Sequence, residues 1–309
     1  MAALKEYPGA GESIVVDDGS SDDSCEILAE EFPETRLVLH ERNRGFAEAV
    51  HSGVQAARFE FLILLNSDVR PEPGFIAPLV RRLREPPVFS VSPLILEETG
   101  KIHPCSLNCF SARQSRFKRH REVWARPVPM GLARPSVFAS GGSMAVKKSR
   151  FLELGGFLPI FRPFYWEDFD LGIRAWRRGW RVVMEPSSVV VHQSRGSIRE
   201  NVARRKVRVA VRRNELLVEW IHAPVPRLLR GFLPRLALRT VARTMIGDTL
   251  FWAALLGALA RLPQVVETRR KLAADRAMIK SLPEILAEIE QENQRLFERE
   301  ADRCKQSEA

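Results

Sequence analysis

Three clusters of acidic side chains each lie at the end of an apolar segment or just after one. They are Asp17 and Asp18 in SIVVDDGSSDDS, Asp68 in FEFLILLNSDV, and Glu167, Asp168 and Asp170 in FYWEDFDLGIRAW. In open α/β sheets, ligands bind outside the carboxyl ends of the strands. A magnesium or manganese ion needs one or two protein carboxylates when a substrate diphosphate supplies further oxygens. The pattern therefore indicates chemistry on an activated phosphate compound.

Two of the clusters suggest distinct chemical roles. Asp68 offers a carboxylate to Mg²⁺ or Mn²⁺, with Asn66 as a neutral acceptor, and the ion would neutralise charge on a diphosphate leaving group. Asp168 or Glu167 would act as the general base for an attacking hydroxyl, and the helix N-terminus there favours the ionised form. Each cluster alone also fits a capping or turn sequence. Their joint occurrence in this order favours the catalytic interpretation.

An alternation of strands and helices must position these residues. The apolar run from 59 to 65 is nearly continuous, which is typical of a parallel strand buried on both faces. The pattern predicts an α/β domain with a mixed, mostly parallel sheet and helices on both faces. Strands are predicted at 13–16, 36–40, 59–65 and 88–96, helices at 25–32, 45–57, 74–84, 147–154 and 168–178, and a hairpin-like pair of strands at 181–197.

Near residue 199 the alternation of strands and helices gives way to helical patterns alone. We therefore predict a catalytic domain at 1–198 and a helical, basic region at 199–309. Leucine and arginine alternate from Arg227 to Arg239. This pattern suits either an interfacial helix on anionic lipid or a helical hairpin packed on the catalytic domain. The tail from Pro283 is expected to be a single exposed helix or a short coiled coil.

The bulk composition narrows the classes of function. The chain has 309 residues and a formal net charge of +10, and its basic segment around 204–213 has no interleaved aromatics for base stacking. Nucleic acid is therefore not the expected partner. Four cysteines do not form a disulfide framework in a chain of this length. The longest apolar run, 249–260, is about half a membrane span, and no secretory signal opens the sequence, so we expect a cytoplasmic protein at the inner face of the plasma membrane.

Five segments in a fixed order resemble the family 2 glycosyltransferases, which have the GT-A fold, and especially their bacterial rhamnosyltransferase-like branch. They cover roughly residues 9–197 and read IVVDDGSSDDS, NRGFAEAVHSGVQAA, LLNSDVRPEPGF, GGSMAVKKSRFLELGGF and FYWEDFDLGIRAWRRGWRVVMEPSSVVVHQSRGS. The resemblance implies inverting transfer of a sugar from a nucleotide-diphosphate donor, in a single displacement at the anomeric carbon. The implied acceptor is lipid-linked or a glycan of the cell envelope, with rhamnose as one candidate sugar.

The resemblance also implies roles for individual residues. Asp168 would be the catalytic base, with Glu167 beside it, and Asp68 would bind the metal together with His192. A lone histidine after a strand is also commonly structural. The donor side would be formed by Asp17, Asp18, Arg42, Asn43, Gly45, Asn66 and Asp68, and the acceptor side by Gly141, Gly142, Ser143 and Trp166.

Two departures from the family pattern bear on activity. Asn66 stands where the metal-binding motif of the family has its first acid, and the family's opening strand and loop do not precede 13–16. Backbone groups beside a missing central strand would be left unpaired, which is costly when they are buried. An upstream start is one expectation. The alternative is a truncated, inactive domain that binds nucleotide-sugar, membrane or a partner.

Overall fold

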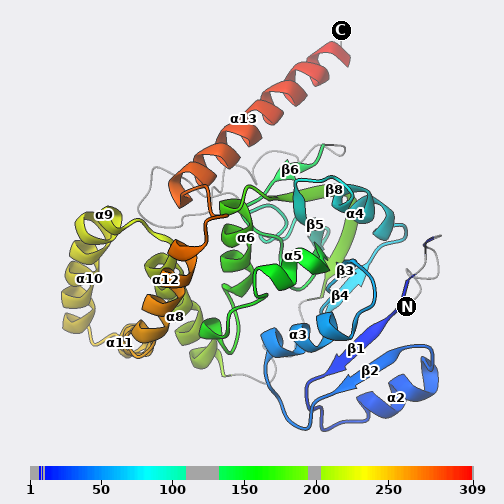
Figure 1. The fold of residues 1–309 in the computed structure, drawn as a ribbon, viewed down its shortest axis with the longest axis horizontal. Coiled ribbons are helices and arrows are strands. Elements are labelled where there is room, and N and C mark those ends of the chain that lie inside the picture. Colours follow the sequence, from blue (N-terminus) through cyan, green and yellow to red (C-terminus); the bar gives the residue numbers. More distant parts are fainter. Residues whose placement is uncertain (1–6, 8, 10, 109–131, 194–202, 308–309) are drawn as a thin grey trace.

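The computed structural model describes residues 7, 9, 11–108, 132–193 and 203–307. Its first part is a small parallel sheet in which β1 (Ile14–Asp17) pairs with β2 (Arg36–Leu39), connected by α2 (Ser24–Glu31). These two strands have no hydrogen-bonded partner in the larger sheet among the described residues. Figure 1 shows them below the body of the molecule, next to α3 (Phe46–Ala56).

The larger sheet has six strands and is mixed, as predicted. Its order is β3-β7-β5-β8-β4, with β6 also paired to β8. The expectation of a mostly parallel sheet is wrong for these strands, since β5 with β8 is the parallel pair and the other described pairings are antiparallel. The strands are β3 (Phe61–Ile63), β4 (Val69–Pro71), β5 (Val88–Glu97), β6 (Arg134–Pro135), β7 (Ala145–Lys147) and β8 (Arg181–His192).

Two strands differ from their predicted forms. The strand in the apolar run from 59 to 65 is short and pairs antiparallel with β7. Its partner β7 follows β4, α4, β5 and β6 in the chain, so no local connection sets the direction of this pairing. The described residues of the predicted hairpin at 181–197 form one strand up to His192, with an irregular register beside Pro93 and Leu94. Residues 194–197 of that prediction lie outside the described residues. Glu185 accepts hydrogen bonds from Ser187 at this irregularity, so the Pro-Ser-Ser sequence forms a bulge and not a turn.

Helices cover both faces of the larger sheet. Alternate residues of β8 point to opposite faces, so Val183 packs with α4 (Ile76–Leu83), whereas Val182 and Met184 join the core on the other face. That second core also holds α5 (Lys148–Glu153) and α6 (Glu167–Arg177), through Phe151, Phe169 and Trp176. The helix α6, which carries the third acidic cluster, is therefore fixed by buried aromatic side chains.

The described residues from 203 onward are mainly helical, as predicted. Their elements are α8 (Arg204–His222), α9 (Val225–Arg227), η3 (Leu228–Phe232), α10 (Leu233–Met245), α11 (Thr249–Leu259), α12 (Leu262–Ala274) and α13 (Leu282–Ser307). No single described helix is both long and apolar enough to cross a membrane, although α11 and α12 together, bent by 53°, meet that test of length and composition.

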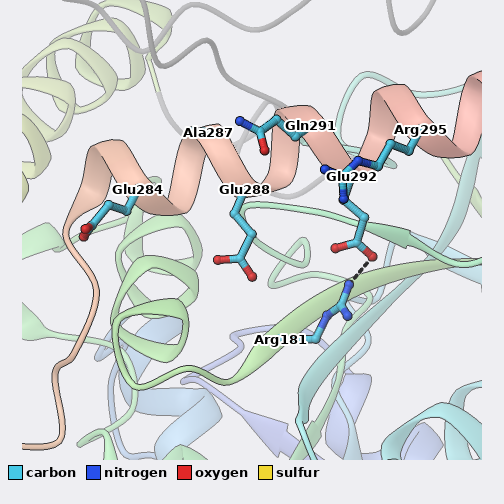
Figure 2. A pocket seen from close by; sticks show the side chains of 7 residues that line it. All are labelled: Arg181, Glu284, Ala287, Glu288, Gln291, Glu292 and Arg295. Carbon is cyan, nitrogen blue, oxygen red and sulfur yellow. Dashed lines mark hydrogen bonds and ion pairs between the residues drawn. The ribbon is translucent and has the colours of Figure 1, made fainter.

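The tail helix α13 is docked at its start, which corrects the expectation of an exposed helix. Ile285, Leu286 and Ile289 are almost fully buried in the second core. Figure 2 shows the next turns lying above Arg181, which pairs with Glu292. A periodic apolar stripe predicts a buried face but does not say which surface covers it, so the docking was not predictable.

Candidate active site

The loop before α3 is held by the carboxylate of Asp18. One oxygen accepts hydrogen bonds from the backbone N of Arg44 and from Nδ1 of His40, at 2.8 and 2.7 Å, and the other accepts from the N of Gly45 at 2.8 Å. Gly45 has φ +90°, which favours glycine. Asp18 therefore shapes the predicted donor pocket by fixing this loop.

Three other residues predicted on the donor side, Asp17, Arg42 and Asn43, lie near this loop. Asp17 ends β1 and accepts a hydrogen bond from the backbone N of Ser20 at 3.1 Å, and hydrogen bonding from Ser20 lowers the pKa of Asp17 despite burial. A Cβ on Gly19 would lie 2.7 Å from the backbone of Arg42, so the loops after β1 and β2 touch. Arg42 and Asn43 are exposed beside them, which leaves both side chains accessible to a ligand.

Asp68 and His192 meet at one end of the larger sheet. Nε2 of His192 lies 3.6 Å from Oδ2 of Asp68, and Oδ1 of Asp68 is buried without a hydrogen-bond partner among the described residues. The ring of His103, which sequence reasoning did not single out, lies 5.0 Å from that of His192.

These observations fit a divalent cation bound largely through its substrate. No group of three or more acidic, histidine or cysteine ligands exists within the described residues. An ion held by Asp68 and His192 would therefore need further oxygens, which a diphosphate supplies.

A glycine pair connects the metal motif with the third acidic cluster. The backbone N of Asn66 donates to the carbonyl of Gly142 at 2.9 Å, and the N of Gly141 donates to Oδ2 of Asp168 at 3.2 Å. A Cβ on Gly142 would lie 2.8 Å from the side-chain amide of Asn66, so no larger residue fits there without movement. The adjacent residues Gly141 and Gly142 therefore hold the segments that bear Asn66 and Asp168 next to each other.

The loop before α3 that Asp18 holds lies next to the same pair of glycines. A Cβ on Gly141 would lie 3.3 Å from the ring of Phe46, the first residue of α3, and one on Gly45 would lie 3.6 Å from the carbonyl of Pro163. Ser143 follows the glycine pair, and its buried hydroxyl has no hydrogen-bond partner among the described residues. The predicted donor-side and acceptor-side segments therefore converge.

The entry to α6 is a strained loop. Tyr165 and Trp166 both have positive φ, 73° and 77°, which bulky residues rarely adopt. The side-chain amide of Asn214, in α8, donates to the carbonyls of Phe161, Phe164 and Tyr165. Asn214 was not predicted, because nothing in its local sequence distinguishes it from other helical asparagines. The C-terminal helix α8 therefore helps to shape the loop in which Trp166 was predicted to contact an acceptor.

The two adjacent carboxyls at the start of α6 differ in burial and in their hydrogen bonds. Glu167 is 7% exposed, and burial, together with the charge of Asp168, raises the pKa of Glu167 to about 8. Glu167 is therefore largely protonated at neutral pH and cannot accept a proton. Asp168 is half-buried and accepts hydrogen bonds from the N atoms of Gly141 and Phe169, which stabilise its negative charge. Asp168 is the better base.

The raised pKa of Glu167 leads to a prediction about stability. Between about pH 5 and pH 8 the folded chain keeps a proton that the unfolded chain has released, so the free energy of unfolding falls as pH rises. Glu167→Gln removes this dependence, and we expect the variant to gain stability over the wild type across that window, on the order of 3 kcal/mol by pH 8. Denaturant unfolding at four pH values measures it. The exposed control Glu98→Gln should show the same dependence of the free energy of unfolding on pH as the wild type. The same dependence in Glu167→Gln would refute the raised pKa of Glu167.

Asp170 does not belong to the site, although it lies in the same acidic cluster. It is fully buried, its carboxylate pairs with Arg174 at 2.6 Å, and it accepts from Nε2 of His222 at 2.8 Å. Burial raises the pKa of Asp170, but the charge of Arg174 and the His222 hydrogen bond outweigh it and lower the pKa. Asp170 therefore anchors α6 to α8.

Two cavities in the described part of the molecule lie away from the acidic residues. One, of about 470 Å³, lies between α13 and Arg181, and the other, of about 400 Å³, lies where α8, α12 and α13 meet. Neither is lined by Asp68 or Asp168. The candidate site is therefore identified by converging side chains and not by an enclosed volume.

Comparison with known proteins identifies the family that the sequence matches and the fold. Residues 2–138 match the family model described as glycosyl transferase family 2, which confirms the resemblance found in the sequence. A solved structure of GalNAc-T7 with UDP, GalNAc and Mn²⁺ superposes with a TM-score of 0.53 at 21% identity, over 68% of this chain and 42% of that one. The chain therefore has the predicted GT-A fold with a helical C-terminal extension.

Two of the curated relatives come from Mycobacterium tuberculosis. An N-acetylglucosaminyl-diphospho-decaprenol L-rhamnosyltransferase is 27% identical over 205 residues, which are 58% of this chain and 65% of the relative. A pre-mycofactocin glycosyltransferase is 26% identical over 196 residues, which are 62% of this chain and 39% of the relative. The chain thus spans less than two thirds of the length of either relative.

Proposed function

We propose that the chain, whose residues 2–138 match the family 2 glycosyltransferases, is an inverting glycosyltransferase that uses a nucleotide-diphosphate sugar. The observation that carries the proposal is a pair of hydrogen bonds. Gly142 accepts one from Asn66, and Gly141 donates the other to Asp168. These bonds put a carboxylate suited to proton removal next to the segment that bears Asp68.

The reaction follows from these positions. The acceptor hydroxyl gives its proton to Asp168 while its oxygen attacks the anomeric carbon, and the bond from that carbon to the diphosphate oxygen breaks. The loop held by Asp18 binds the nucleotide, and the acceptor lies over Gly141, Gly142, Ser143 and Trp166. Asp68 and His192 would hold a magnesium or manganese ion, which would supply positive charge to neutralise the leaving diphosphate.

The finer identity of the substrates rests on the relatives. The name of the M. tuberculosis rhamnosyltransferase specifies rhamnose and a lipid-linked diphosphate acceptor. For this chain we propose a lipid-linked or glycan acceptor of the cell envelope, with rhamnose as the first sugar to test.

The test is a screen of nucleotide-sugars for release of nucleoside diphosphate. We expect one donor to be turned over with Mn²⁺ or Mg²⁺, and a chelator to stop the reaction. Asp68→Ala should raise the metal concentration needed for half-maximal activity at least about tenfold. Unchanged metal dependence in Asp68→Ala would move the ion elsewhere. Donor binding without any turnover would make the chain a non-catalytic nucleotide-sugar binder.

The segment from α9 to α10 supports a peripheral membrane position. Large apolar side chains are exposed along α10, among them Leu238 at 72% and Met245 at 84%, and α10 has no buried residue. The exposed Arg230 and Arg235 lie on the same segment. Apolar side chains flanked by arginines suit the headgroup region of an anionic bilayer, so we propose peripheral attachment to the cytoplasmic face of the plasma membrane.

Vesicle co-sedimentation tests this attachment. We expect the chain to bind vesicles containing anionic phosphatidylglycerol much more than neutral phosphatidylcholine vesicles. The double substitution Leu238→Glu and Met245→Glu should reduce binding at least about tenfold, because it places charge on the apolar face. The matched control is Ile279→Glu, at an exposed apolar residue before α13 (71% exposed), which should bind normally. Equal loss in both variants would argue against this surface.

A further inference from the structure

Three polar side chains form a hydrogen-bonded row behind the loop before α3. Nδ1 of His40 lies 2.7 Å from Oδ1 of Asp18, and Nε2 of the same ring lies 2.8 Å from Oγ of Ser52. Asp18 and His40 directly follow β1 and β2, and Ser52 lies in the interior of α3. The side chain of His40 is only 4% exposed, whereas that of Asp18 is 18% exposed. The row therefore runs from a buried helix face to the edge of the proposed donor pocket.

Close packing of α3 on the small sheet fixes the position of Ser52. A Cβ on Gly53, the next residue, would lie 3.1 Å from Cγ2 of Val16 in β1, so the helix approaches this strand closely. Nη1 of Arg36, the first residue of β2, donates to the carbonyl of Ala56 at 2.8 Å. Figure 1 shows α3 beside both strands. The helix is therefore a fixed support from which Ser52 can orient the ring of His40.

The direction of the hydrogen bonds follows from the groups involved. Oδ1 of Asp18 also accepts from the backbone N of Arg44 at 2.8 Å, so it is an acceptor and Nδ1 of His40 is the donor. A hydroxyl can donate or accept, so Ser52 can hold Nε2 whether or not that nitrogen carries a hydrogen. Oδ2 of Asp18 accepts from the N of Gly45 at 2.8 Å. The row therefore keeps the carboxylate turned toward both of these N–H groups.

The order aspartate, histidine, serine also occurs in enzymes that use serine as a nucleophile. That chemistry needs N–H donors beside the serine that stabilise an oxyanion. Ser52 lies inside α3, where backbone N–H groups are bound to the carbonyls four residues earlier. These groups cannot stabilise an oxyanion, so the arrangement suits the positioning of Asp18 and not nucleophilic attack.

From these contacts we propose that His40 and Ser52 are positioning residues for the donor. They hold Asp18, and through it the N–H groups of Arg44 and Gly45, so that the loop keeps its shape before a ligand arrives. A loop that is already ordered loses less conformational entropy on binding, which raises its affinity for the ligand. The inference rests on the proposed function for the identity of that ligand, a nucleotide-diphosphate sugar.

Hydrogen exchange of the free chain tests the positioning role without any substrate. NMR gives the exchange rates of the backbone N–H groups of Arg44 and Gly45 in the wild type, His40→Ala and Ser52→Ala. We expect both groups to exchange at least about fivefold faster in either variant, because the carboxylate that they share is no longer held. The N–H of Val54, a buried residue of α3, is the internal reference and should exchange at the wild-type rate.

Steady-state kinetics, with the donor that the nucleotide-sugar screen identifies, test the consequence for binding. His40→Ala and Ser52→Ala should raise the donor KM at least about fivefold and change kcat by less than about threefold, because the general base Asp168 lies on another element, α6. Ser52→Thr keeps the hydroxyl and should retain the wild-type KM. The matched control is Gln55→Ala, at an exposed residue of α3, which should behave like the wild type in both measurements.

The outcomes separate this inference from the proposed function. If no nucleotide-sugar is turned over, the proposed function fails, and exchange at Arg44 and Gly45 still decides the positioning role. Unchanged exchange at these two groups in both variants, or an equal increase at Val54, would overturn that role. Faster exchange with an unchanged donor KM would overturn its link to donor binding. If His40→Ala does not fold, the same criteria apply to Ser52→Ala, which removes only a hydroxyl.

Discussion

Asp168→Asn is expected to reduce the rate of sugar transfer by about 10²- to 10⁴-fold, the usual contribution of a general base. The amide keeps the shape of the side chain and can still accept the hydrogen bond from the backbone N of Gly141. It cannot take a proton from the acceptor hydroxyl. Donor binding should change by less than about threefold, because the donor contacts come from other loops. Single-turnover rates and calorimetric donor titration measure the two quantities.

The control for this experiment is Asp22→Asn, at an exposed aspartate in the loop before α2. It should leave both the rate and donor binding near the wild-type values. Equal loss of the rate and of donor binding in Asp168→Asn would mean that Asp168 maintains the structure of the site and is not the base.

Asp170→Ala is expected to lower the free energy of unfolding by about 3–5 kcal/mol, the usual effect of breaking a buried ion pair. The substitution leaves Arg174 and His222 buried without the carboxylate that pairs with both. The midpoint of denaturant unfolding, followed by circular dichroism, gives the change.

Substitutions with graded expected costs test whether the loss of stability comes from the contacts of Asp170 with Arg174 and His222. His222→Ala should cost less than Asp170→Ala, since Asp170 keeps its pair with Arg174. Glu267→Ala breaks the exposed pair with Lys271 and should cost less than about 1 kcal/mol. A cost of Asp170→Ala no larger than that of Glu267→Ala would contradict the assigned role of the network.

The local pattern of the sequence was sufficient for many elements. Helices such as α3 and α6 agree with prediction within one or two residues, because their turn residues and apolar spacing are local signals. Strand pairing was not predictable in the same way. The direction of β3 depends on β7, more than eighty residues later in the chain, and the bulge in β8 depends on its register with β5. Such pairings are set by contacts distant in sequence.

The candidate site shows the same contrast between what local sequence signals predict and what distant contacts determine. Asp68 and Asp168 were predicted from residue type and spacing, His192 and the glycine pair from the family resemblance, and the structure brings their segments together. The supporting residues His40 and Asn214 were not predicted, because each acts on a loop 20 or more residues away. Asp170 was grouped with the reactive carboxyls, since only the fold shows that it is buried against Arg174.

Anomalous diffraction from crystals of the chain with Mn²⁺ and a nucleoside diphosphate tests the central claim most directly. The account predicts a manganese peak about 2.0–2.6 Å from Asp68 and His192, with the diphosphate as its other ligand and facing Asp168. A manganese ion bound at other residues, with Asp68 and His192 in contact with neither metal nor diphosphate, would contradict it.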